Sequence, residues 1–146
     1  MRRSWLTRLM GSVLLAAVLA WGLLDAPSAP AEESIDDLGS RFQSQLQDRK
    51  YDEAAQTMQQ IIAVAEQQLG PDHPKVADAI ESLGTLYSTQ NRDAEAEPYF
   101  RRALAIKEKT LGADHPEVAT LLISLANAAQ NQGRYPEAET LARRAV

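Results

Sequence analysis

The sequence predicts an all-α protein, an α-solenoid of antiparallel helix pairs stacked one after another. Three observations support this fold class. Segments of the chain repeat at a fixed offset of 42 residues. Apolar residues within each repeat recur at helical spacing, and only seven Gly and seven Pro leave most of the chain free to be helical. A fixed period of this length is typical of stacked supersecondary units, and the chain after residue 31 holds about 2.5 of them.

The composition limits the kinds of protein this chain can be. At 146 residues it is long enough for one ordinary domain, and 45% hydrophobic with 24% charged residues is typical of a globular chain. There is no cysteine, which excludes disulfides, thiolate metal sites and cysteine nucleophiles. The net charge of -5 makes nucleic acid or an anionic membrane an unfavourable partner.

Residues 1–31 have the pattern of a secretory signal peptide. Three basic residues open it: Arg2, Arg3 and Arg8. A 16-residue apolar run follows from Leu9 to Leu24, and the small residues Ala29 and Ala31 form an A-x-A site. We expect cleavage after Ala31 and export to the periplasm or medium, without stable membrane insertion. The mature chain would hold 12 basic and 19 acidic residues, a net charge of -7.

Two alternatives to this interpretation stay open. The apolar run could be an uncleaved membrane anchor, although it is shorter than the roughly 20 residues that span a bilayer. The pair Arg2-Arg3 is compatible with twin-arginine export as well as with the general secretory route.

Residues 32–50 predict a single helix, either a degenerate first repeat or an N-terminal cap. Ser34 with Asp37 has the spacing of a capping box. One apolar stripe follows, made of Ile35, Leu38, Phe42 and Leu46. Arg49 stands where the later repeats have Asn91 and Gly133, so this unit departs from their pattern.

The repeats occupy residues 51–92, 93–134 and, in part, 135–146. A nine-residue block starting at Leu69 recurs at Leu111 with seven identities, and the first two repeats share 15 identities in all. First helices are predicted over 74–90 and 116–132, and a second helix over 94–110.

Helix boundaries and buried faces follow from residue types. Pro74 and Pro116 suit a first helical turn, and Gly70 and Gly112 suit helix ends. The first helices bury Val76, Ile80, Leu83 and Tyr87, then Val118, Leu122, Leu125 and Ala129. The second helix buries Ala96, Tyr99, Phe100, Ala103, Leu104 and Leu111.

These residues resemble the tetratricopeptide repeat, in the 42-residue form of kinesin light chains and many bacterial proteins. The family pattern is met by Leu83-Gly84, Tyr87, Ala96, Phe100 and Ala103. The last unit departs from it with Ala126, Ala129 and Ala142. The resemblance implies a superhelix whose concave face, lined by the first helices, binds peptides or proteins.

No enzyme motif is present. The sequence has no phosphate-binding glycine loop, His-Glu-x-x-His or nucleophile elbow, so we expect no catalytic, cofactor or metal site. His73 and His115 recur beside Asp72 and Asp114 in the turns. We expect a structural role in which the Asp caps the helix and the His closes the turn. The pairs Arg101-Arg102 and Arg143-Arg144 predict a solvated ridge.

The resemblance implies a binding groove on the first helices. The residues expected to line it are Asp78, Glu81, Thr85, Ser88, Thr89, Thr120, Ile123, Asn127, Gln130 and Asn131. None is basic, so the groove is predicted to be neutral to acidic and to suit a basic peptide or protein segment. The alternative is an ordinary solvated helix face.

Two classes of function stay open from the sequence. The first is an exported protein–protein interaction module without catalysis. The second is the N-terminal part of a longer exported enzyme or sensor whose catalytic region lies beyond Val146. The last helix exposes an apolar stripe, which is expected either to fray or to self-associate; it consists of Ala138, Leu141, Ala142 and Ala145.

Overall fold

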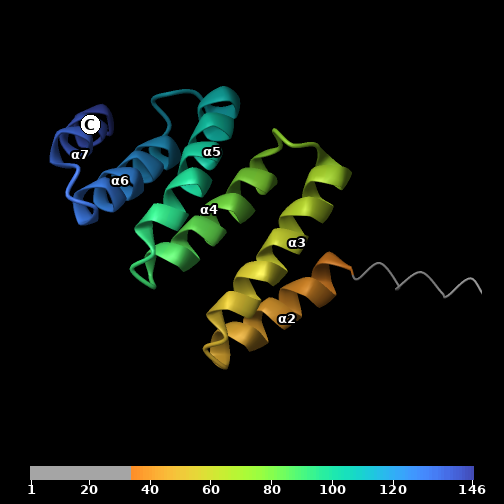
Figure 1. Ribbon diagram of the computed structural model, residues 1–146. Helices are drawn as coiled ribbons and strands as arrows, with labels where there is room; N and C mark the ends of the chain where they lie inside the picture. The colour runs from red at the N-terminus through yellow and green to blue at the C-terminus, as the bar shows by residue number, and fades with distance from the viewer. Residues whose placement is uncertain (1–33) are drawn as a thin grey trace, which may run out of the picture. The chain divides into compact units, whose positions relative to one another are not determined.

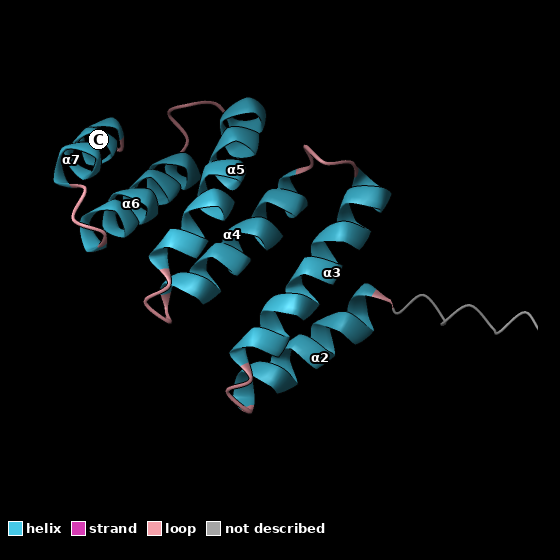
Figure 2. Cartoon of the chain, in the orientation of Figure 1, coloured by secondary structure: helices cyan, strands magenta, loops and turns pink. Residues whose placement is uncertain are grey.

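The computed structural model describes residues 34–146, so the predicted signal peptide and its cleavage point lie outside the described residues. Within residues 34–146, six helices form three antiparallel hairpins stacked side by side (Figures 1 and 2). The hairpins pair α2 (Ile35–Gln47) with α3 (Tyr51–Leu69), α4 (Pro74–Ser88) with α5 (Asp93–Leu111), and α6 (Pro116–Asn131) with α7 (Tyr135–Arg144). No described helix is long and apolar enough to cross a membrane.

The observed helices confirm the predicted fold class and the predicted apolar faces. Both predicted first helices begin at their proline and end one or two residues earlier than expected. Their apolar stripes are buried, with Val76, Ile80 and Leu83 fully inaccessible to solvent. Leu111 was wrongly placed in the buried face of α5. It is 37% exposed, because it is the last residue of that helix and precedes the turn at Gly112.

The first helix of each hairpin ends in the same turn. The amides of Lys50, Arg92 and Arg134 donate to carbonyls five residues earlier, at 2.8, 3.0 and 2.8 Å. This bond defines the Schellman motif, which needs a left-handed residue just before the donor. Those residues are Arg49 (φ 57°), Asn91 (φ 60°) and Gly133 (φ 74°). The first unit therefore keeps the repeat's geometry although its sequence departs from the pattern.

We expect Arg49→Gly to raise the free energy of unfolding by about 0.5–1 kcal/mol. A side chain at positive φ is strained, and glycine relieves that strain. The gain in stability is partly offset because glycine has more conformational entropy to lose from the unfolded chain. Urea denaturation would measure the change. Gly133→Arg is the matched control and should destabilise; equal stability of both variants with the parent would contradict the shared turn.

The paired arginines of the second helices are exposed, as the predicted solvated ridge requires, and one arginine of each pair also forms an ion pair with the preceding hairpin. Arg102 of α5 pairs with Glu66 of α3, and Arg144 of α7 pairs with Glu108 of α5. Both pairs join successive hairpins, and they are related by the 42-residue offset. The second helices are therefore linked by an ionic contact that repeats along the chain. The sequence of one helix could not reveal this contact, because the partners of each arginine lie one repeat away.

Candidate functional site

The predicted groove residues lie along one side of α4 and α6, with Thr89 directly after α4. Eight of the ten are exposed, whereas Glu81 and Ser88 are half-buried. We call this surface the α4–α6 stripe. It consists of the ten residues predicted from the sequence, Asp78, Glu81, Thr85, Ser88, Thr89, Thr120, Ile123, Asn127, Gln130 and Asn131. The structure divides them into four groups with different partners.

The acidic group surrounds a lysine that comes from another helix. Lys107 of α5 places its ammonium 2.8 Å from Asp78, 2.7 Å from Glu81 and 2.8 Å from Glu117. These four residues form what we call the Lys107 cluster. The lysine side chain is only 4% exposed, whereas Asp78 and Glu117 are 59% and 51% exposed. With three carboxylates around one ammonium, the cluster carries a net charge of -2.

The carboxylates keep this buried lysine charged. Burial disfavours the ammonium and lowers the pKa of Lys107, but hydrogen bonds to Asp78, Glu117 and Glu81 outweigh burial and raise the pKa above its ordinary value. The lysine thereby fixes acidic side chains of α4 and of α6 around one point. The stripe is thus acidic at this end, although two of its acids are already paired.

Sequence reasoning missed Lys107 because it searched only the first helices for basic residues. A signal was available, since Lys107 aligns with Ala65, a buried position of α3. A lysine at a repeat position that is otherwise buried and small must find an anionic partner.

A second group ties the two hairpins together. Asp93, at the start of α5, is 6% exposed. Its carboxylate accepts hydrogen bonds from the Ser88 hydroxyl at 2.8 Å and from the Asn131 side-chain amide at 2.9 Å. Ser88 and Asn131 therefore have a structural role in the junction between α4, α5 and α6.

The threonines of the stripe bond to their own helices. The hydroxyls of Thr85 and Thr120 donate to carbonyls four residues earlier, at 3.0 and 3.1 Å, and Thr89 donates to the Leu86 carbonyl at 3.0 Å. Each hydroxyl oxygen can still accept a hydrogen bond from a ligand.

The remaining stripe residues line an open apolar cavity of about 260 Å³ between α6 and α7, which we call the end cavity. From α6 it is lined by Ile123, Ala126, Asn127 and Gln130. From α7 it is lined by Tyr135, Ala138, Glu139 and Ala142, which the groove prediction missed.

The end cavity exists because one side chain is much smaller than its counterpart in the preceding hairpin. There, the Phe100 ring lies against Gly84, so close that a Cβ on Gly84 would be 2.8 Å from the ring. The corresponding residues of the last hairpin are Ala142 and Ala126. Without the aromatic ring, the space between the two helices stays open.

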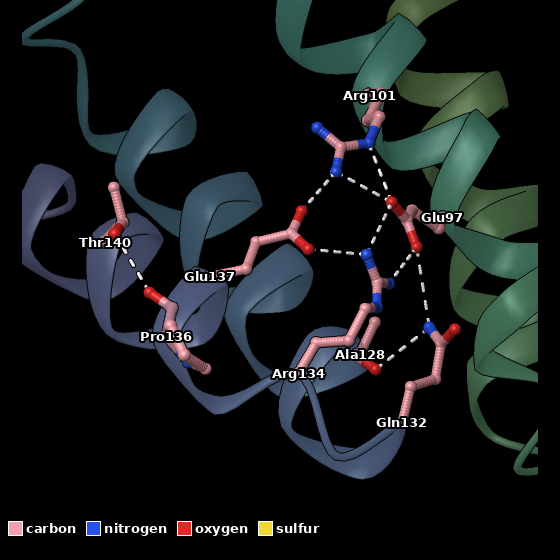
Figure 3. A network of polar contacts seen from close by, with 8 residues as sticks. All are labelled: Glu97, Arg101, Ala128, Gln132, Arg134, Pro136, Glu137 and Thr140. Carbon is pink, nitrogen blue, oxygen red and sulfur yellow. Dashed lines mark hydrogen bonds and ion pairs between the residues drawn. The ribbon is translucent and has the colours of Figure 1, made fainter.

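An ionic network joins α5 to the last hairpin (Figure 3). Arg101 lies 2.7 Å from Glu97 and 2.5 Å from Glu137, and Arg134 lies 2.6 Å from Glu137 and also pairs with Glu97. We call these four residues the ion square. Burial raises the pKa of Glu97, but hydrogen bonds from Arg134 and Arg101 outweigh it and leave the pKa below its usual range.

The two histidines cap helices, so the expectation that Asp72 and Asp114 would be the caps is wrong, whereas the histidine amides close the turns onto Gly70 and Gly112, as expected. The Nδ1 atoms of His73 and His115 each accept a hydrogen bond, at 3.2 Å, from the amide two residues ahead. Asp72 instead pairs with Lys109. The imidazole fits as the cap because its Nδ1 reaches the second amide of the helix, an unpaired donor in every helix. No group of metal-ligating side chains occurs among residues 34–146.

Replacing both histidines by alanine should lower the free energy of unfolding by about 1 kcal/mol for each lost cap. Urea titration would measure the loss. His73→Asn with His115→Asn is the matched control, because asparagine accepts the same hydrogen bond, and most of the stability should return. An alanine variant that keeps its stability but loses a bound metal would overturn the capping role.

Comparison with known proteins identifies the family to which the chain belongs. A family model described as tetratricopeptide repeat matches residues 44–109 and 94–146. The crystal structure of BtubC (BKLC) from P. vanneervenii is similar, with a TM-score of 0.69 and 24% identity over 80% of this chain and 48% of that one. Nearly identical TPR-like repeats from Podosopora anserina, named after kinesin light chain, give a TM-score of 0.63 and 24% identity over 80% of this chain and 56% of theirs.

A variant of the Podosopora anserina protein gives a TM-score of 0.64 and 24% identity over 81% of this chain and 57% of that one. The chain thus spans about half the length of the solved proteins it matches. No curated protein matches the sequence. The likeness to solved structures shows the fold, and the family model matches well over half of the residues. The protein therefore belongs to the tetratricopeptide repeat family.

Proposed function

We propose that the chain is an exported interaction module whose α4–α6 stripe binds a basic segment of a peptide or protein. Tetratricopeptide repeats suggest a scaffold for protein–protein interaction. The observation that carries the finer proposal is the net charge of the Lys107 cluster. One ammonium leaves two of its three negative charges uncompensated.

The exposure of the cluster favours binding. Asp78 and Glu117 are more than half exposed, so a ligand cation can reach them while both keep part of their hydration. Lys107 holds both carboxylates in place before a ligand arrives, which reduces the entropy that binding would cost. The threonine hydroxyls of the stripe add acceptors for backbone amides of the ligand.

A basic peptide should bind more tightly than an acidic peptide of the same length, by about tenfold at low salt. The preference should shrink as salt rises, because the Debye length is about 10 Å at 0.1 M. Fluorescence anisotropy would measure both affinities.

Two double variants distinguish the effect of the Lys107 cluster from the effect of the protein's net charge. Asp78→Asn with Glu117→Gln should remove the preference. Asp36→Asn with Glu53→Gln changes net charge equally but lies on α2 and α3, and it should leave the preference intact. Equal binding of both peptides at low salt, or equal loss in the two double variants, would contradict the site.

We also propose that residues 1–31 direct export and are then removed by cleavage after Ala31. The basic start, apolar run and A-x-A site support this. The mature protein would begin at Glu32, which mass spectrometry of protein from the periplasm or medium would detect. An intact Met1 in the membrane fraction would support an anchor instead.

A further inference from the structure

The α4–α6 stripe is shared between two hairpins, so its shape depends on how α6 lies against α4 and α5 (Figure 1). Three leucines anchor α6 up to its middle: Leu121, Leu122 and Leu125 are each at most 1% exposed. After Leu125 the buried residues of α6 are alanines only, namely Ala126, Ala128 and Ala129. Alanines bury little apolar area, so the end of α6 depends more on polar contacts than its middle does.

A continuous series of polar contacts holds this end of α6. The Asp93 carboxylate joins Ser88 of α4 to Asn131 of α6, at 2.8 and 2.9 Å. One turn further along α5, Glu97 pairs with Arg134, which directly precedes α7 (Figure 3). Because Ser88 and Asn131 belong to the stripe, the stripe and the ion square are parts of one contact network.

The charges of the ion square alternate, so that each member contacts both members of opposite sign. Glu97 is the least exposed of the four, at 17%. Removal of Arg134 would leave two carboxylates facing one arginine, and removal of Glu97 would leave two arginines facing one carboxylate. Either change breaks the direct ionic link from Glu97 to Arg134 at the end of α6.

We propose that the ion square regulates ligand binding at the α4–α6 stripe, because it keeps the end of α6 beside α4 although none of its members belongs to the stripe. This inference rests on the proposed function of the stripe. A ligand that binds the Lys107 cluster and continues along the stripe to Asn131 needs that end of α6 in place. When the square is broken, a smaller fraction of the protein has the binding arrangement, and the apparent affinity falls by that fraction.

The length of the stripe defines the ligand that senses this control. Asp78 and Ser88 are ten residues apart in α4, which corresponds to about 15 Å along the helix axis. An extended segment of about five residues spans this distance. The probe is therefore a labelled peptide with a pair of arginines at its centre and enough uncharged residues on either side to span the stripe in both directions.

Two single variants with opposite changes of charge test the regulation. Glu97→Gln removes a negative charge, whereas Arg134→Gln removes a positive one. An effect of overall charge alone would weaken binding of the basic peptide in the first variant and strengthen it in the second. We expect both variants to bind about fivefold more weakly, which is within the range for residues that act on a site through coupling. Fluorescence anisotropy would measure the affinities.

Matched controls and a rescue variant separate the square from charge. Glu139→Gln and Arg143→Gln make the same two charge changes in an exposed pair whose members both belong to α7. They should shift the affinity less than about twofold, as expected for exposed charges. Inversion of the whole square keeps its alternation and the net charge and should restore the affinity of the parent; it consists of Glu97→Arg, Arg101→Glu, Arg134→Glu and Glu137→Arg.

Hydrogen exchange without peptide reports the position of α6 independently of the ligand. In Glu97→Gln and Arg134→Gln, amides around Asn131 should exchange faster than in the parent, whereas amides of α2 and α3 should not change. The buried leucines should keep both variants folded, which circular dichroism checks. If a single variant unfolds, the inverted square still decides: a folded inverted variant that binds more weakly than the parent would contradict the regulation.

The failure of this inference differs from the failure of the proposed function. Parent-like affinity in both single variants, or shifts in opposite directions, would overturn the regulation and leave the basic-peptide site intact. A parent protein that binds basic and acidic peptides equally would overturn the proposed function and the regulation with it. Hydrogen exchange around Asn131 would then still show whether the square holds the end of α6.

Discussion

Phe100→Ala is expected to lower the free energy of unfolding by about 3–5 kcal/mol, the range for a buried aromatic replaced by alanine. Phe100 is 2% exposed and lies between α4 and α5. Its removal leaves a cavity that the helix backbones cannot close. Urea denaturation would measure the loss, and Phe100→Leu, with a smaller expected loss, keeps the measurement possible if the alanine variant does not fold.

Gly84→Ala tests the same contact from the other helix. The added Cβ would lie 2.8 Å from the Phe100 ring, and overpacking of this kind costs about 1–3 kcal/mol. Gly39→Ala is the control, because Gly39 also lies inside a helix and nothing lies within 4 Å of its added Cβ. The control should gain up to about 1 kcal/mol from helix propensity. A Gly84→Ala variant as stable as the control would contradict the close approach of α4 and α5.

Lys107→Met is expected to lower the free energy of unfolding by about 1–3 kcal/mol. Breaking a buried ion pair on one side costs about 3–5 kcal/mol, and the exposure of Asp78 and Glu117 reduces that cost. The same change takes the cluster from a net charge of -2 to -3. The variant should therefore bind a basic peptide more tightly although it is less stable.

The contribution of Lys107 to the free energy of unfolding depends on pH in a defined direction. The folded protein raises the pKa of Lys107, so the lysine's stabilisation is complete below its unfolded value of about 10.4 and is lost as pH rises beyond it. Lys109→Met is the control, because it breaks the exposed ion pair with Asp72. It should lower the free energy of unfolding by less than about 0.5 kcal/mol. A Lys107→Met variant no less stable than this control would contradict the burial of the lysine.

The fold could be predicted from the sequence because its determinants are local and repeat. Pro74 and Pro116 begin helices, Gly70 and Gly112 end them, and apolar residues recur at helical spacing. The left-handed turn at Arg49 escaped prediction because the bond that requires it, from Lys50 to Gln45, exists only in the folded turn.

The candidate site could be predicted only in part. Periodicity correctly identified eight exposed positions, whereas Glu81 and Ser88 are half-buried. It could not reveal the Lys107 cluster, since the lysine and its acids come from three different helices. The end cavity escaped for a related reason. It depends on Ala126 and Ala142 facing each other across two helices, and a stripe on one helix does not show what lies opposite.

The central claim is that the α4–α6 stripe binds a basic segment, and amide chemical-shift mapping by NMR tests it most directly. Titration with the basic peptide should shift the amides of α4 and α6 around Asp78 and Glu117, while amides of α2 and α3 stay in place. In Asp78→Asn with Glu117→Gln, the shifts should disappear at the same peptide concentration. Shifts confined to the other helices, or an unchanged map in that double variant, would contradict the claim.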